Sequence, residues 1–76
     1  MKLTPIGSNQ NMITTSKGDQ ILFSYQTPVA AYLADTGDYV KTQVNWSRTT
    51  TRHINSWLQG VTAETVPQGH LDALAQ

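Results

Sequence analysis

The residues best suited to chemistry lie in one stretch, NWSRTTTRHINSWLQG, at positions 45–60. This stretch contains both tryptophans of the chain together with Arg48, Arg52 and His53. Arginine side chains bind phosphate and carboxylate groups in a bidentate manner, and histidine can act as an acid, a base or a metal ligand. The stretch is therefore interpreted either as a contact patch for an anionic partner or as the solvated side of a helix.

Few other residues could support catalysis. His53 and His70 are the only histidines, cysteine is absent, and the five carboxylates are spread through predicted turns and the C-terminal part of the chain. General acid–base and nucleophilic catalysis need such groups close together in defined arrangements. The sequence also lacks the glycine-rich motifs that bind phosphates. We therefore expect no enzyme, no cofactor and no metal site, and the lack of cysteine excludes disulfide bonds.

The positive charge of the chain is concentrated in its middle. The formal net charge is zero, but residues 39–63 contain Lys41, Arg48 and Arg52 and no Asp or Glu. A locally basic segment in a neutral chain is compatible with a patch for an anionic partner. Because three cations release few counterions, nucleic-acid binding by this segment would be weak at physiological salt.

Alternating apolar residues and turn signals predict a sheet. Only 13% of the residues are charged, and much of the remainder is Thr, Ser, Asn and Gln, which favours ordered, β-rich structure. We expect strands over NMITT, QILFSYQ, VAAYLA and YVKTQVNW, at positions 11–15, 20–26, 29–34 and 39–46. KLTPI at 2–6 could add an edge strand, and VAAYLA would also suit a helix. Gly18 supplies the positive φ of a hairpin loop, and Pro28 marks an edge, a bend or a bulge.

Strand periodicity assigns these side chains to the two faces of the sheet. In the second strand Ile21, Phe23 and Tyr25 share one face, and the other face is mostly polar. In the fourth strand one face carries Val40, Thr42, Val44 and Trp46. The opposite face is expected to point outward and carries Tyr39, Lys41, Gln43 and Asn45.

The apolar period changes from strand to helix after position 46. Ile54, Trp57 and Leu58 are spaced as on one side of a helix, which Ser47 or Thr49 could cap and Gly60 could end. Arg48, Arg52 and His53 are expected to face water on the other side of this helix. A second, short helix is predicted from Pro67 through Leu71 and Leu74.

These elements predict a single α+β domain spanning residues 1–76. It would have a small antiparallel sheet of four or five strands with one packed helix and a short C-terminal helix. The predicted core consists of Ile21, Phe23, Leu33, Val40, Val44, Trp46, Ile54, Trp57 and Leu58.

A polar surface without catalytic groups favours a protein-binding module. The predicted partner-binding residues are Tyr39, Lys41, Gln43, Asn45, Arg48, Arg52 and His53. One alternative is a weak nucleic-acid-binding domain that uses the basic 39–53 segment, and another is a homo-oligomer formed by pairing of an exposed sheet edge. The sequence shows neither the pattern of a signal peptide nor an apolar run of about 18 residues, so we expect a cytoplasmic protein without membrane contact.

Two segments resemble a group of small proteins of tailed bacteriophages and related bacterial loci. A SYxTPVA segment is matched by Ser24, Tyr25, Thr27, Pro28, Val29 and Ala30. A TTxxHINxWL helix is matched by Thr49, Thr50, His53, Ile54, Asn55, Trp57 and Leu58. No function is assigned to this group. The resemblance therefore implies a setting, the host cytoplasm, and an accessory protein that binds or inhibits a host protein, which could be a defence protein, or else a homo-oligomeric structural phage protein. It also implies that Thr49, His53 and Asn55 form a recurrent polar element, in which His53 or a threonine would tie the helix start to the preceding strand.

Overall fold

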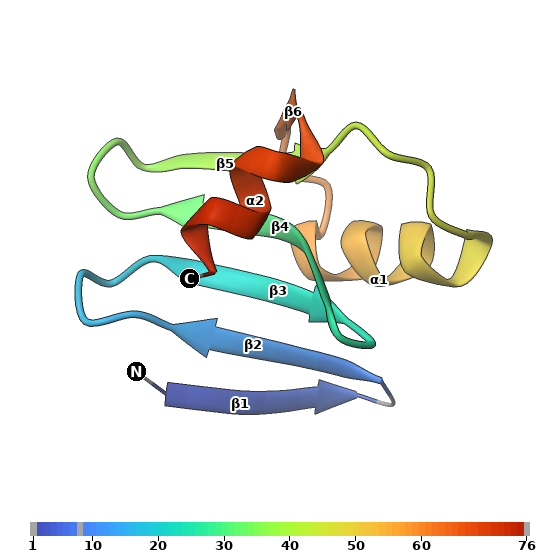
Figure 1. The fold of residues 1–76 in the computed structure, drawn as a ribbon, viewed down its shortest axis with the longest axis horizontal. Coiled ribbons are helices and arrows are strands. Elements are labelled where there is room, and N and C mark those ends of the chain that lie inside the picture. The colour runs from blue at the N-terminus through green and yellow to red at the C-terminus, as the bar shows by residue number, and fades with distance from the viewer. Residues whose placement is uncertain (1, 8, 76) are drawn as a thin grey trace.

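Six strands form one sheet in the computed structural model, which describes residues 2–7 and 9–75 (Figure 1). The strands lie side by side in the order in which the chain forms them. Their bounds are β1 Lys2–Gly7, β2 Gln10–Thr14, β3 Gln20–Ser24, β4 Thr27–Leu33, β5 Asp38–Thr42 and β6 Glu64–Val66. Two helices complete the described fold, α1 Arg48–Leu58 between β5 and β6 and α2 Gln68–Leu74 after β6.

The sheet is mixed, because its last strand runs parallel to its neighbour. Strands β1 to β5 pair antiparallel in succession, whereas β6 pairs with β5 in parallel and places Val66 opposite Thr42. A parallel pair needs a crossover connection, and α1 lies in that connection. The prediction of an antiparallel sheet of four or five strands with one packed helix is therefore wrong, although the fold is broadly α+β. The missed strand, β6, has only three residues, and Val66 is its one apolar side chain.

The two helices cover opposite faces of the sheet and bury its central strands from both sides. Successive side chains of a strand point to opposite faces. Leu22 and Ala30 pack with Ile54 of α1, whereas their chain neighbours Ile21 and Ala31 belong to the cluster beneath α2. The face of β3 that was expected to be mostly polar, with Leu22 and Ser24, is therefore buried beneath α1.

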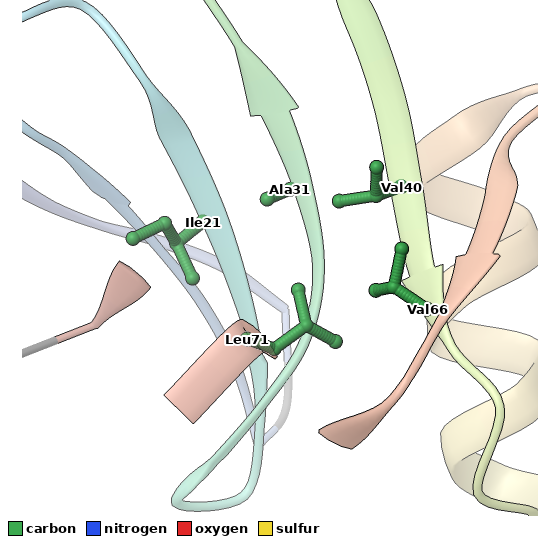
Figure 2. Packing of buried hydrophobic residues seen from close by; sticks show 5 residues of the cluster. All are labelled: Ile21, Ala31, Val40, Val66 and Leu71. Carbon is green, nitrogen blue, oxygen red and sulfur yellow. The ribbon is translucent and has the colours of Figure 1, made fainter. Parts of the chain in front are cut away.

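Leu71 of α2 is the centre of the second cluster. Figure 2 shows its side chain among those of Ile21, Ala31, Val40 and Val66. Leu71 is completely buried, and burying a leucine side chain stabilises a fold by about 1.5–3 kcal/mol. Since a helix of seven residues is too short to be stable alone, this packing holds α2 on the sheet. The predicted C-terminal helix is confirmed.

The predicted core is only partly the observed one. Buried as predicted are Ile21, Val40, Ile54 and Leu58, and half-buried against the clusters are Phe23, Leu33 and Trp57. Val44 and Trp46 are exposed instead of buried, because β5 ends at Thr42 and the chain leaves the sheet before it reaches them. The buried apolar residues that the prediction lacked are Leu22, Val29, Ala30, Ala31, Val66 and Leu71.

Several local signals in the sequence have the predicted structural role. Gly18 has a φ of 94° in the turn between β2 and β3, and Pro28 lies where the pairing of β3 with β4 is shifted by a bulge. Ser47 caps α1, because its Oγ accepts a hydrogen bond from the Thr50 N–H at 3.1 Å. The helix ends at Gln59, which takes the left-handed conformation with a φ of 51°, and Gly60 follows with a φ of 85°.

Strands β1 and β2 form the side of the sheet that the helices cover least (Figure 1). The main contacts of α1 are with β3 and β4, and those of α2 are with β4 and β5. Leu3 is consequently 61% exposed, and Ile6 is 42% exposed. The predicted edge strand therefore exists, and its outer edge is open among the described residues.

Candidate functional site

The seven predicted partner-binding residues do not lie on one outward face. Tyr39 and Lys41 are half-buried on the sheet face that α1 covers, where Lys41 is paired with Ala30. The exposed members are Gln43 and Asn45, which follow β5, and Arg48 and Arg52, which lie on α1. His53 is buried.

Tyr39 belongs to an aromatic cluster beneath α1. Its ring centroid lies 4.9 Å from that of Tyr32 on β4 and 5.9 Å from that of Trp57 on α1. Offset and edge-on contacts of this kind stabilise a packed layer. The expectation that Tyr39 points outward as a binding residue is therefore wrong, because α1 packs over the face of β5 that was assigned to solvent.

His53 also points toward the sheet. Its Nδ1 lies 2.7 Å from the Oγ of Ser24 at the end of β3. His53 was expected to face water with Arg48 and Arg52, but the buried stripe of α1 includes Thr50, His53 and Ile54. A histidine can join such a stripe when a buried partner satisfies its ring nitrogen, and Ser24 does so here.

Hydroxyl groups extend this contact into a chain. The Ser24 Oγ lies 3.0 Å from the Thr50 Oγ1, and the Ser47 hydroxyl donates to the Thr50 Oγ1 at 3.2 Å. If each hydroxyl donates once, the chain runs from Ser47 through Thr50 and Ser24 to His53, whose Nδ1 then accepts. The chain ties the start of α1 to β3. A tie of the helix start to the preceding strand was expected from the motif resemblance, and here the strand is β3 rather than the preceding strand.

A serine hydroxyl next to a histidine nitrogen also raises the question of nucleophilic catalysis. Ser24 is only 2% exposed, and its hydroxyl contacts Thr50 as well as His53. A substrate carbonyl would have to reach an oxygen that lies beneath α1. The geometry therefore supports a structural role for this pair.

Trp46, which was expected in the core, is an exposed aromatic side chain within the segment of the predicted site. Trp46 is 49% exposed, and its Nε1–H donates to the Oε1 of Gln68 on α2 at 3.1 Å. The Gln68 Nε2 in turn donates to the Pro28 carbonyl at 2.7 Å and to the Asp72 Oδ1 at 3.0 Å. The indole is thus held in place while much of its surface faces solvent.

Exposed residues continue from Trp46 in both directions along the chain. Apart from Thr50, every residue from Gln43 to Arg52 is exposed, and we call this segment the 43–52 surface. A shallow groove of about 180 Å³ runs along its edge, lined by Lys41, Gln43, Asn45, Thr51 and Asn55 among others. The structure therefore brings Lys41, Gln43 and Asn45 together beside α1, although not as one face of a strand.

The 43–52 surface is basic. Arg48 and Arg52 make no ion pair with any carboxylate among the described residues, where the two ion pairs join Lys17 to Asp19 and to Asp35. The two arginines are spaced i and i+4 on α1, so they lie on the same side of the helix.

Trp46 was missed as a surface residue, although the sequence held a signal for it. A helix capped at Ser47 needs residues before the cap that turn the chain out of the sheet, and residues 43–46 do so after β5 ends at Thr42.

The described residues contain no cluster of metal-ligating side chains and no helix that could span a membrane. Among residues 2–7 and 9–75, no three metal-ligating side chains of His, Asp or Glu lie close enough together to hold an ion. Neither α1 nor α2, the helices of the described part, has the length and hydropathy needed to cross a bilayer.

Comparison with known proteins gives a family without a known activity. No curated protein and no solved structure matches the chain. One family model, described as a family of unknown function (DUF8033), matches residues 1–73. Because this match spans almost the whole sequence, the chain belongs to the DUF8033 family.

Proposed function

We propose that this protein is a non-enzymatic protein-binding module whose partner contacts the 43–52 surface. The observation that carries the proposal is Trp46, which is half exposed although its indole is fixed by Gln68. Tryptophan and arginine are the residue types most enriched at interface hot spots, and a fixed side chain loses little entropy on binding. Trp46 therefore serves as the apolar anchor, with Val44 beside it in the chain.

The charges of this surface indicate the kind of partner. Lys41, Arg48 and Arg52 are the cations of the segment from 39 to 63, which contains no acidic residue. Complementary potentials favour a partner with carboxylates that face Arg48 and Arg52 and an apolar pocket that receives Trp46. The further idea of a phage-type accessory protein, with a host protein as its partner and the host cytoplasm as its setting, rests on the resemblance of the two motif segments alone.

Nucleic-acid binding is the second candidate, because an exposed indole could stack on a base while arginines contact phosphates. The neighbourhood of Trp46 argues against it. Gln68 bonds both Trp46 and Asp72, so a carboxylate lies close to the indole. Three cations also release too few counterions for tight binding at physiological salt.

The test is photo-crosslinking from position 45 in host lysate, followed by affinity measurements with the captured protein. We expect Trp46→Ala to weaken binding about 30-fold or more, the loss of a hot spot of about 2 kcal/mol. Replacing Arg48 and Arg52 with alanine should slow association and reduce its salt dependence.

Leu3→Ala is the matched control, since Leu3 is an exposed apolar residue on β1, far from the 43–52 surface in the fold (Figure 1). This variant should bind like the unmodified protein. Equal affinities for Trp46→Ala and Leu3→Ala would rule out the anchor. Capture of nucleic acid with a steep salt dependence, and of no protein, would favour the second candidate instead.

A further inference from the structure

Two turns meet at one end of the sheet in an unusual backbone conformation. Asn9 lies in the turn between β1 and β2, and Tyr25 lies in the turn between β3 and β4. Their φ angles are 60° and 58°, and the Tyr25 N–H donates to the Asn9 carbonyl at 2.7 Å. Asparagine tolerates this left-handed region, but a bulky residue such as tyrosine seldom occupies it. Residues held in such conformations occur preferentially at functional sites.

The side chain of Tyr25 is displayed rather than buried. It is 51% exposed, and its ring centroid lies 6.0 Å from that of His53. One side of the tyrosine ring therefore rests near the buried hydroxyl chain, which is tied to α1 through Ser24 and Thr50. The remaining ring surface is available to a ligand.

An open pocket of about 590 Å³ lies beside this ring, lined by Asn9, Asn11, Tyr25, Gln26 and Thr27. None of these residues carries a charge. The side-chain amides of Asn11 and Gln26 and the hydroxyl of Thr27 make no hydrogen bond to the rest of the described chain. The pocket therefore combines an aromatic surface with free neutral groups that both donate and accept hydrogen bonds.

We propose that this pocket binds a neutral oligosaccharide. Sugar hydroxyls donate and accept at adjacent positions, and the amides of Asn9, Asn11 and Gln26 offer the complementary pattern. The C–H face of a pyranose ring is apolar and suits the exposed face of Tyr25. A nucleotide would also stack on tyrosine, but no lysine or arginine lines the pocket to pair with its phosphate. The absence of charge is what favours a sugar.

The strained backbone gives a test that separates binding from folding. In Tyr25→Asn the new residue tolerates the φ of 58°, so the folded protein should keep a similar or higher unfolding midpoint. The same change removes the aromatic surface, so sugar binding should fall at least tenfold. If Tyr25 served only to pack on His53, the Tyr25→Asn variant would instead be clearly less stable than the unmodified protein.

The measurement is a titration of the isotope-labelled protein with chitotriose, maltotriose and cellotriose, followed by amide chemical shifts. We expect at least one sugar to shift the backbone signals of Tyr25 and Gln26 together with the side-chain amide of Asn11. Thr27→Ala should weaken this response, whereas Thr62→Ala, which removes an exposed threonine outside the pocket, should leave it unchanged. Trp46→Ala should also leave it unchanged, so this proposal and the proposed function can fail separately.

Three outcomes would overturn the sugar site. The first is that none of the three sugars, and no neutral glycan on an array, binds the protein. The second is that sugar binding survives in Tyr25→Asn. The third is that adenosine monophosphate or an uncharged acetylated peptide shifts the same signals while the sugars do not, which would identify the pocket as a nucleotide or peptide site.

Discussion

Ser24 joins two parts of the chain that are 29 residues apart in sequence. Its hydroxyl is the shared partner of His53 and Thr50, and all three side chains are buried. A buried polar group without a hydrogen-bond partner lowers the stability of the fold. Replacing the central hydroxyl would therefore leave the buried His53 Nδ1 without its partner and Thr50 with the Ser47 hydroxyl alone.

We expect Ser24→Ala to lower the free energy of unfolding by about 1–3 kcal/mol, the cost of leaving buried polar groups unsatisfied. Urea denaturation followed by circular dichroism measures this change. Ser56→Ala is the matched control, because Ser56 is exposed on α1 and should change stability by no more than about 0.5 kcal/mol. Equal midpoints for the two variants would contradict the role of the hydroxyl chain.

The sequence predicted only some of the side chains that are buried between α1 and the sheet. The burial of Ile54 and Leu58 was predicted correctly, because apolar side chains at helical spacing pack against the core. His53 and Ser24 were not, since a polar side chain is buried only if a distant partner meets it, and that partner lies on another element. Tyr25 was assigned to a strand, because nothing in its side chain signals a positive φ.

At the scale of elements, the two helices depend on the sheet in different ways. α1 has 11 residues, a serine cap and a stripe of buried side chains, and its position was predicted from these features. α2 has seven residues, its cap Pro67 makes no side-chain hydrogen bond, and Leu71 is its one fully buried residue. The shorter helix is therefore held mainly by Leu71, with Leu74 half-buried against the same cluster and Gln68 bonded to the Pro28 carbonyl.

We expect Leu71→Ala to destabilise the protein by about 2–5 kcal/mol, because it removes a buried leucine from the centre of a packed cluster. His70→Ala, at the exposed neighbouring position, is the control and should stay close to the unmodified protein. Urea titration with circular dichroism compares the two. A loss below about 1 kcal/mol in Leu71→Ala would show that the sheet does not need α2.

Two strands, β5 and β6, were predicted incorrectly, each for a physical reason. β6 is too short to show a period, and its parallel pairing depends on a helix that returns the chain to β5. The predicted strand over 39–46 is longer than β5, because QVNW continues the alternation of polar and apolar side chains. The structure ends the strand at Thr42 and caps the helix at Ser47. The β2–β3 hairpin with its Gly18 turn was predicted, since its two strands are neighbours in the sequence.

At the scale of the whole molecule, the open edge of β1 is where we expect a second copy to pair. Leu3 and Ile6 are exposed there, a combination that favours pairing with another strand. Pro5 lies between them and pairs with Asn11 of β2. Because proline has no N–H, we expect its nitrogen to face the open edge, where it removes a donor from any added strand.

We expect Pro5→Thr to promote self-association, because it restores that donor on an apolar edge. Size-exclusion chromatography with light scattering should give a larger average mass than for the unmodified protein at the same concentration. Thr4→Val adds an apolar β-branched residue to the same strand without freeing an N–H, so it is the control. Equal masses for all three proteins would show that Pro5 does not limit edge pairing.

The hydrogen bond from Trp46 to Gln68 has a consequence for synthesis on the ribosome. The indole belongs to the middle of the chain, but the amide that fixes it is made 22 residues later, on the last helix. A growing chain that already displays the basic segment would still have a mobile tryptophan and an uncovered sheet face. Such an intermediate should recognise a partner poorly, so recognition would mature only after α2 has emerged and docked.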